Sequence, residues 1–232
     1  MSKADIRNAA TVILVRDPDT CPRVLMGQRG ANAAFMPSRF VFPGGALDPG
    51  DRDVPLAAPL DPGCAARLAE DAPDWMPNAL AAAAVREVWE ETGLILGAPG
   101  DWPGEVPPDW TDFAATGHLP SPTGLSFVFR ALTPPGRPRR FDARFFLADA
   151  AHLRGDPDDF DRASDELSHL QWIPLDEVRA FHMPFITEVV LAEVAAALPC
   201  LDAPDSVPFF RNDDEESLFL RLGGRPLDQL HK

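Results

Sequence analysis

The sequence is compatible with an α/β fold, and its composition and length restrict the class further. Three predicted strands are followed by a helix, then by further strands and a final helical part. Apolar residues make up 45% of the chain and include fifteen Phe and five Trp, which excludes general disorder. The 232 residues suffice for one sizeable domain with additions, whereas two full domains would be tight.

The N-terminal part predicts three strands. Residues 9–15 form an apolar run that ends at a turn rich in Asp and Pro, a pattern typical of a buried strand. Residues 23–29 alternate and predict a second strand, paired with the first as a hairpin. Residues 40–42 predict a short strand that runs into Gly44 and Gly45, and the missing side chains there permit a tight backbone turn.

Residues 78–92 predict the central helix. The Ala-rich start of this segment favours helix, and Gly93 stands where helices commonly end. On a helix, Glu87, Glu90 and Glu91 gather on one side because their spacings bring them together. Small and apolar residues cover the other side, so that side is expected to pack on the core.

Two interpretations of this three-glutamate cluster are open: a solvated acidic face, or a site for a divalent metal. Three carboxylates in one narrow arc repel one another unless a cation lies among them. An all-oxygen ligand set suits Mg²⁺ first and Mn²⁺ next. Arg86 lies one turn before Glu90 and is placed to orient its carboxylate. Together with the upstream glycine pair, this context favours the metal site.

Residues 86–94, Arg-Glu-Val-Trp-Glu-Glu-Thr-Gly-Leu, resemble the second half of the Nudix box. That motif marks a superfamily that hydrolyses nucleoside diphosphates linked to another group. Gly45 followed after five residues by Asp51 resembles the first half. Two features depart from the usual box: the acid is Asp where Glu is usual, and the 34 residues of 52–85 make the separation unusually long. The halves can still meet if about 52–78 loop out.

The resemblance implies a Nudix-type α/β/α sandwich with a mixed sheet, and the predicted order of elements is compatible with it. It implies a single Nudix hydrolase domain over residues 1–232, with an insertion at about 52–78 inside the box. A helical or irregular extension is expected from about 184, starting with a helix at 184–198. The tail, with its acidic run at 213–216, is expected to be a solvated loop. By analogy with relatives, a homodimer is one expected assembly.

Site residues also follow from the resemblance. Glu87, Glu90 and Glu91 are the expected ligands of Mg²⁺ or Mn²⁺, with the Gly45 carbonyl as an additional backbone ligand. These glutamates and Arg86, which is expected to orient Glu90, form the expected catalytic group. Asp51 is expected to hold the box together. Glu166 is a candidate base from outside the box, with an ordinary loop acid as the other interpretation.

Arginines in the predicted strand 139–147 contrast with the formal net charge of −15. Guanidinium groups recognise phosphate well, but the same residues are equally consistent with surface charge on an edge strand. Arg140 is the favoured candidate for substrate binding. Arg29, at the end of the second predicted strand, is a weaker one.

The branch of the superfamily follows from residues 35–38, the long interruption of the box and residues 139–147. Together they resemble the peroxisomal coenzyme A diphosphatases. This implies metal-dependent cleavage of the pyrophosphate bond of coenzyme A or an acyl-CoA, with ADP-ribose or a dinucleotide as the alternative substrate. A non-catalytic, nucleotide-binding regulatory domain is the alternative from another class. Loss of a metal-site glutamate would favour that class, and all three are present, so catalysis is favoured.

Charge and cysteine content restrict location and partners. The net charge of −15 argues against a nucleic-acid-binding surface. Cys21, Cys64 and Cys200 show neither zinc spacing nor a disulfide framework, which favours a reducing cytoplasm. The first residues carry no signal-like segment, and no apolar run is long enough to span a bilayer. We therefore expect a cytoplasmic protein that acts on a small-molecule nucleotide, without membrane or nucleic-acid partners.

Overall fold

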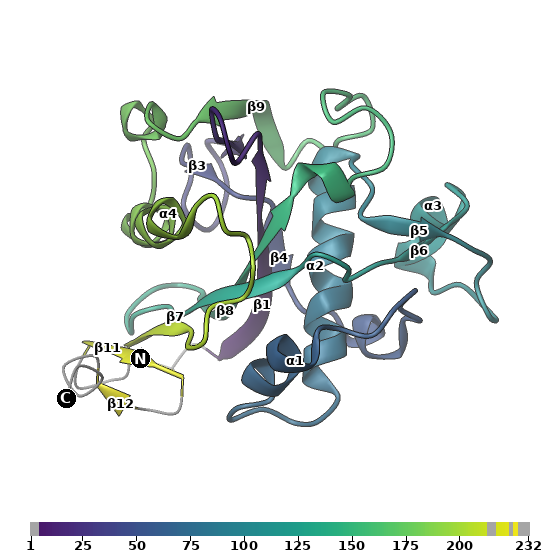
Figure 1. Ribbon diagram of the computed structural model, residues 1–232, viewed down its shortest axis with the longest axis horizontal. Helices are drawn as coiled ribbons and strands as arrows, with labels where there is room; N and C mark the ends of the chain where they lie inside the picture. The colour runs from purple at the N-terminus through teal and green to yellow at the C-terminus, as the bar shows by residue number, and fades with distance from the viewer. Residues whose placement is uncertain (1–4, 213–216, 223–224, 227–232) are drawn as a thin grey trace.

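A computed structural model describes residues 5–212, 217–222 and 225–226 of the chain. A mixed β-sheet forms its centre, and helices cover both faces (Figure 1). The strands are β1 (Ile6–Arg16), β2 (Arg23–Arg29), β3 (Phe40–Val41), β4 (Gly44–Ala46), β5 (Gly97–Pro99), β6 (His118–Pro120), β7 (Ser126–Leu132), β8 (Arg140–Asp149), β9 (Leu167–Pro174), β10 (Pro208–Asn212), β11 (Ser217–Arg221) and β12 (Arg225–Pro226). The α-helices are α1 (Pro62–Leu68), α2 (Met76–Thr92), α3 (Thr111–Ala114) and α4 (Phe185–Ala197). Short 3₁₀ helices lie at Pro49–Asp53, Pro108–Trp110, Ala150–His152 and Val178–Ala180.

The large sheet combines parallel and antiparallel pairs. Its strand order is β12-β11-β10-β7-β8-β1-β2-β3, with β4 added beside β1 and β9 beside β2. The central pair β1–β8 is parallel, whereas β1–β2 and β7–β8 are antiparallel. Strands β5 and β6 form a separate small sheet. The predicted hairpin of the first two strands is therefore present.

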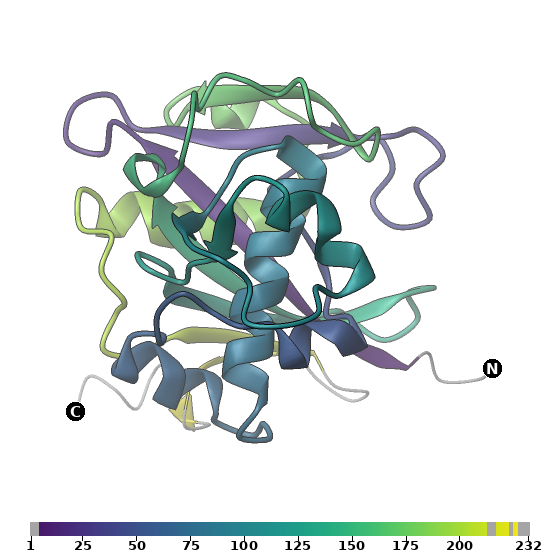
Figure 2. The same ribbon diagram turned by 90° about the vertical axis from the view of Figure 1, so that its right-hand side faces the viewer.

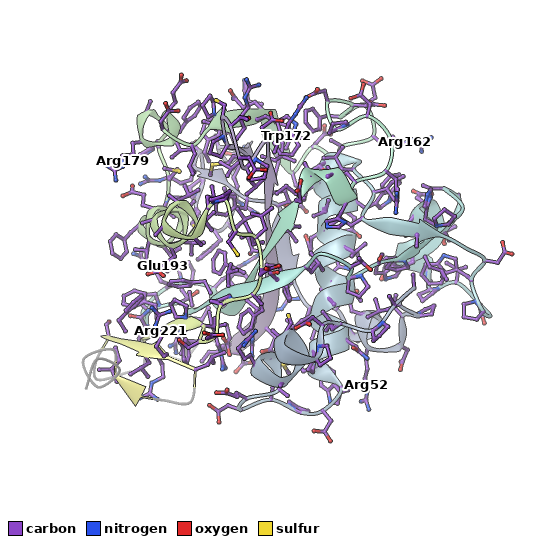
Figure 3. The ribbon with its side chains drawn as sticks, in the orientation of Figure 1. Arg52, Arg162, Trp172, Arg179, Glu193 and Arg221 are labelled. Atoms are coloured by element: carbon purple, nitrogen blue, oxygen red, sulfur yellow. The ribbon has the colours of Figure 1, made fainter. Side chains whose placement is uncertain are left out.

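Each face of the large sheet has its own core. Along β1, Val12 and Leu14 pack on the side of α2, while Ile13 and Val15 pack on the side of α4. This follows from the strand geometry, in which successive side chains point to opposite faces. Side chains fill the space between the sheet and the helices on both sides (Figure 3). The predicted α/β/α sandwich with a mixed sheet is confirmed.

The segment between β4 and α2 folds against the lower end of α2 (Figure 2). Asp61 caps the start of α1, because its side chain accepts a hydrogen bond of 2.9 Å from the Cys64 amide. Cys64 and Leu68 then bury themselves in the α2-side core. A short helix at 65–70 is predicted from sequence, and the observed one is α1.

The C-terminal part differs from the expected irregular extension. The helix expected at 184–198 is α4, but β10 and β11 follow it and extend the sheet beyond β7. These strands are short, and β10 pairs in parallel with the edge of β7. A pairing between segments so far apart in the chain cannot be predicted from a local sequence pattern. The acidic run at 213–216 lies outside the described residues. The described helices include none long and apolar enough to cross a membrane.

Candidate active site

The three glutamates of the cluster lie on the C-terminal half of α2. The helix ends at Thr92, and Gly93 follows in the left-handed conformation with φ 75°. Its amide donates a hydrogen bond of 2.8 Å to the Trp89 carbonyl, which closes the last turn. The predicted helix end is therefore confirmed, and Glu87 and Glu91 are buried at this end of the helix.

Strand β4 approaches the glutamates closely because it begins with two glycines. A β-carbon on Gly45 would lie 2.3 to 2.5 Å from the carboxylate atoms of Glu87. A β-carbon on Gly44 would lie 2.6 Å from the Ala10 carbonyl oxygen. The Gly44 amide donates a hydrogen bond of 2.8 Å to Glu91 Oε2. These glycines thus permit close packing within a strand, and not the tight turn expected from the sequence.

Arg86 joins the helix to the segment that follows β4. Its guanidinium is buried and donates two hydrogen bonds of 3.0 Å to the two carboxylate oxygens of Asp51. It also donates to Glu87 Oε1 at 2.9 Å, to Glu90 Oε2 at 3.0 Å and to the Ala46 carbonyl at 3.0 Å. Such charge-assisted bonds fix the geometry of both partners. Asp51 therefore meets the helix although residues 52–85 intervene.

Burial disfavours the charged forms of the three glutamates, and repulsion by nearby carboxylates adds to this effect. Burial raises the pKa of Glu87 to about 7, although Arg86 acts in the opposite direction. Burial also raises the pKa of Glu90. For Glu91, burial and then the charge of Glu87 hold the pKa well above its ordinary value. A cation placed among these carboxylates would relieve both effects.

The donor atoms of the cluster suit a hard divalent ion. Glu91 Oε1 is buried and has no hydrogen-bond partner among the described residues, and Arg29 Nη1 stands 4.0 Å away. A buried polar atom without a partner costs about 1–3 kcal/mol. As it stands, the described part of the chain holds no group of three or more His, Cys, Asp or Glu side chains arranged for a metal. Glu87 and Glu90 instead face Arg86, so a bound ion would have to replace part of those contacts.

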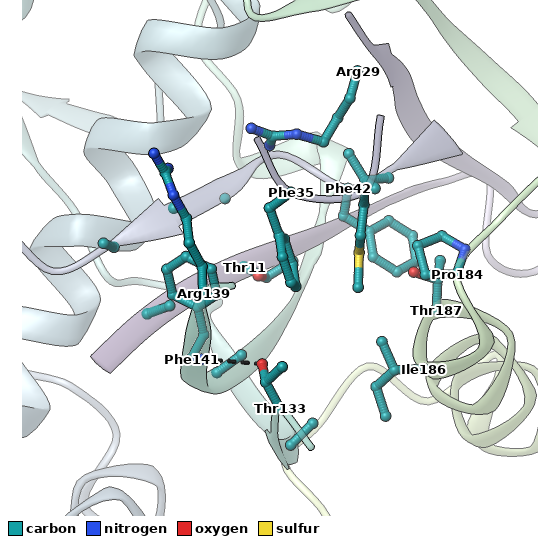
Figure 4. A pocket seen from close by; sticks show the side chains of 18 of the residues that line it. Thr11, Arg29, Phe35, Phe42, Thr133, Arg139, Phe141, Pro184, Ile186 and Thr187 are labelled. Carbon is teal, nitrogen blue, oxygen red and sulfur yellow. Dashed lines mark hydrogen bonds between the residues drawn. The ribbon is translucent and has the colours of Figure 1, made fainter. Parts of the chain in front are cut away.

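A pocket of about 910 Å³ opens beside the cluster (Figure 4). One end is polar and holds Glu87, Glu90 and the glycines of β4. The other end is apolar and lies between β7, β8 and the start of α4. The arginines that line the pocket are Arg7, Arg29, Arg39, Arg86, Arg137 and Arg139. An anionic ligand with an apolar part would match this lining.

Arg140, the favoured candidate for substrate binding, does not line this pocket. It is buried and donates to the backbone carbonyls of Thr133 at 3.0 Å and Asn212 at 3.1 Å. The even-numbered residues of β8 point to the α2 side, where Arg144 contacts Met76. The neighbouring Arg139 lines the pocket and is exposed. In this structure Arg140 thus lies outside the pocket, one position away from Arg139 in the alternation.

Two weaker candidates do lie at the polar end. Arg29 lines the pocket from the end of β2, and its side chain is 24% exposed. Glu166 lies just before β9, lines the same pocket and is exposed. Its negative charge contributes to the raised pKa of both Glu87 and Glu91. The structure therefore brings these two residues into the neighbourhood of the cluster.

The apolar end of the pocket is the feature that the sequence interpretation missed. Phe141, Ala143 and Phe145 line it from alternate positions of β8. That alternation was a usable signal, because it places the three side chains on one sheet face. Trp102 and Trp110 do not line this pocket. They pack against each other in the α2-side core, with ring centroids 5.7 Å apart.

Known proteins with this fold include enzymes of one family. The crystal structure of a NUDIX hydrolase from Alicyclobacillus acidocaldarius is 30% identical in sequence, with a TM-score of 0.59. The match covers 86% of this chain and 94% of that one. A Caenorhabditis elegans protein named "Putative nudix hydrolase 7" is 31% identical over 72% of this chain.

The match covers 51% of the Caenorhabditis elegans protein, so the chain spans about half the length of that relative. No family model matches the chain. The identity of 30% over most of both chains shows the family of this chain. The chain therefore belongs to the Nudix hydrolase family.

Proposed function

We propose that this protein is a divalent-metal-dependent hydrolase that cleaves the pyrophosphate bond of a nucleoside-diphosphate derivative. The observation that carries the proposal is the cluster on α2. Glu87 and Glu90 line the polar end of a ligand-sized pocket, and Glu91, next to them on α2, has a buried oxygen without a partner among the described residues. Family membership supports the reaction type, and the roles of the individual residues are our assignments.

Glu87, Glu90 and Glu91 are assigned as ligands of Mg²⁺ or Mn²⁺, with the Gly45 carbonyl as a further donor. When bound, such an ion supplies charge neutralisation on the phosphates and lowers the pKa of a bound water. Arg86 is assigned a positioning role, because its guanidinium is buried and already bonded to three carboxylates. Asp51 in turn holds Arg86.

Arg29 and Arg139 are assigned to the phosphate oxygens of the substrate. Arg29 ends β2 and Arg139 precedes β8, and Figure 4 shows both guanidinium groups directed to the same end of the pocket. Arg139 has no hydrogen-bond or ion-pair partner among the residues that the structure describes, so its donors are available to a ligand. Glu166 is assigned as the candidate base that takes a proton from the attacking water, with an ordinary loop acid as the alternative.

Coenzyme A or an acyl-CoA is the favoured substrate. The support is the resemblance of residues 35–38 and 139–147 to coenzyme A diphosphatases, together with an interrupted Nudix box whose two parts meet through Asp51 and Arg86. Residues 35–37 and Arg139 also line the pocket. ADP-ribose or a dinucleotide is the alternative substrate.

We further propose a single domain with residues 52–78 as an insertion, a cytoplasmic location and assembly as a homodimer.

Product analysis by mass spectrometry tests this proposal. The protein is incubated with coenzyme A, ADP-ribose, NADH and diadenosine polyphosphates, with Mg²⁺ and then with chelator. Metal-dependent release of 3′,5′-ADP and phosphopantetheine, absent in Glu91→Gln, is the expected result. Cleavage of ADP-ribose alone would move the substrate assignment to the alternative. Tight nucleotide binding without any turnover would instead indicate a regulatory domain and overturn the enzymatic proposal.

A further inference from the structure

Helix α4 covers only part of its face of the sheet. Ile13 and Val15, in the second half of β1, belong to the core that also contains Val190 and Val194 of α4. Ala9 and Thr11, in the first half of the same strand, line the pocket instead. The pocket is therefore the part of this sheet face that α4 leaves open.

The open part of the face is apolar, although the solvent side of a sheet is ordinarily polar. Its floor consists of side chains from β7, β8 and β10, among them Ala131, Phe141 and Phe210. At its rim stands Phe185, the first residue of α4, which is 68% exposed. Only Ile6 and Phe185 are exposed large hydrophobic residues among those described. An apolar floor with an exposed aromatic rim favours an apolar ligand.

The loop between β2 and β3 forms the opposite wall and is held in a strained conformation. Met36 and Ser38 have φ values of 52° and 58°, a region that non-glycine residues rarely adopt. Hydrogen bonds of 3.1 Å fix the loop on both sides, from the Ser38 amide to the Arg29 carbonyl and from Arg39 Nη1 to the Met183 carbonyl. The first bond ties the loop to the end of β2, and the second ties it to the segment that enters α4.

The strained loop places two side chains at the apolar end. Phe35 contacts Phe141 edge to face, with ring centroids 5.2 Å apart (Figure 4). Met36 lines the same end, and a methionine side chain adapts to ligands of different shape. Strained backbone conformations persist only where surrounding bonds hold them, and they are common at ligand-binding sites.

We propose that this apolar end binds an apolar chain attached to the diphosphate of the substrate, and that Phe185, Met36 and Ile186 set the preference for that chain. The inference rests on the proposed function, because it places the diphosphate at the glutamate end of the same pocket. The two ends are continuous in one cavity of about 910 Å³, which is near the upper end of ligand-pocket sizes. A diphosphate alone would leave the apolar end empty.

The test uses two ligand series of increasing chain length. The first consists of n-alkyl esters of α,β-methylene-ADP, which carry a chain on a diphosphate that cannot be hydrolysed at the bridge. Affinity is measured by calorimetry with Mg²⁺ present. The second consists of acyl-CoAs, for which kcat/KM is measured. Affinity for the esters is expected to rise by up to about fourfold per buried methylene and then level off when the end is filled.

Phe185→Ala is the test variant, with Ile6→Ala as the matched control. Both positions are exposed apolar residues, so neither change opens the core. Ile6 lies outside the pocket lining, so Ile6→Ala should keep the wild-type dependence on chain length. Phe185→Ala should lower the affinity ratio of octyl to methyl ester about tenfold, and Phe185→Leu should restore most of it.

The possible outcomes separate this inference from the proposed function. A rise along the ester series with no cleavage of any coenzyme A compound would support the apolar site and reject the favoured substrate. Equal affinity along the ester series, or no binding of it, would overturn the inference. If affinity rose with chain length equally in the wild type and in Phe185→Ala, the alkyl chain would bind elsewhere, and the role assigned to Phe185 would be wrong. If Phe185→Ala abolished a dimer and the affinity of the wild type did not change with ester chain length, a second copy of the chain would cover this face.

Discussion

The two faces of the central sheet are built differently. The face under α2 is closed, and its core contains Trp110, Phe113 and Phe127 in the fully buried state. The face under α4 is closed only in part, and its open half carries the apolar floor of the pocket. Rigid packing holds α2 and the buried Arg86–Asp51 pair in fixed positions, as the support of a catalytic site requires. The open face offers room for a ligand whose shape can vary. We infer that the α2 face determines the reaction and the α4 face determines the substrate.

The largest effect is expected from breaking the buried pair on the α2 face. Asp51→Ala would leave the Arg86 guanidinium without its two-bond partner, and removing one member of a buried pair costs about 3–5 kcal/mol. The free energy of unfolding, measured with urea, should fall by that amount. Asp53→Ala, two residues away and exposed, is the control and should change stability little. An unchanged midpoint for Asp51→Ala would show that Arg86 finds another partner.

The next effect concerns the reaction itself. Glu91→Gln keeps the size of the side chain but removes its negative charge. In the wild type, the buried carboxylate oxygen Oε1 has no hydrogen-bond partner among the described residues. Turnover of the substrate should fall at least about 100-fold, whereas the Gly44 amide can still donate to the remaining amide oxygen. Metal-dependent thermal stabilisation should also disappear. Wild-type turnover in this variant would remove Glu91 from the catalytic group.

Substitution of the two glycines of β4 by alanine should affect different properties of the protein. In Gly45→Ala the new methyl group meets the movable carboxylate of Glu87, so turnover should fall by about 10 to 100-fold with little loss of stability. In Gly44→Ala it meets the Ala10 carbonyl in the backbone of β1, so stability should fall instead. Gly50→Ala, with nothing within 4 Å of the added carbon, is the control. Thermal melts and initial rates on all three variants separate these effects.

The smallest predicted effect tests the alternation along β8. Arg139→Ala should raise KM about tenfold and leave stability unchanged, because Arg139 is exposed and lines the pocket. Arg140→Ala should lower stability by about 1–3 kcal/mol, because the part-buried Thr133 carbonyl and the buried Asn212 carbonyl lose a donor. Its KM should stay near the wild-type value. The reverse pattern would place Arg140 at the substrate.

Much of the α2 face could be predicted from the sequence because its signals are local. The Ala-rich start, the glutamate spacing and Gly93 define α2 within two residues of its observed start at Met76. The meeting of Asp51 and Arg86 across the intervening segment follows from the motif, and the structure agrees.

The α4 face could be predicted far less well because it depends on tertiary context. The choice between Arg139 and Arg140 turns on where β8 begins, since a shift of one residue moves a side chain to the other face. The pocket lining combines residues of β1, β7, β8 and β10, and β1 and β10 are far from the other two strands in the chain. Strand β10 needs the edge of β7 before it can form.

The central claim is that the α2 glutamates form one metal site, and titration of Mn²⁺ into metal-free protein tests it most directly. Electron paramagnetic resonance reports the free ion, so the measurement does not depend on the identity of the substrate. Wild-type protein should bind Mn²⁺ saturably, and Glu91→Gln should bind it at least about 10-fold more weakly. Gly50→Ala should match the wild type. Equal Mn²⁺ affinity in wild type and Glu91→Gln would contradict the claim.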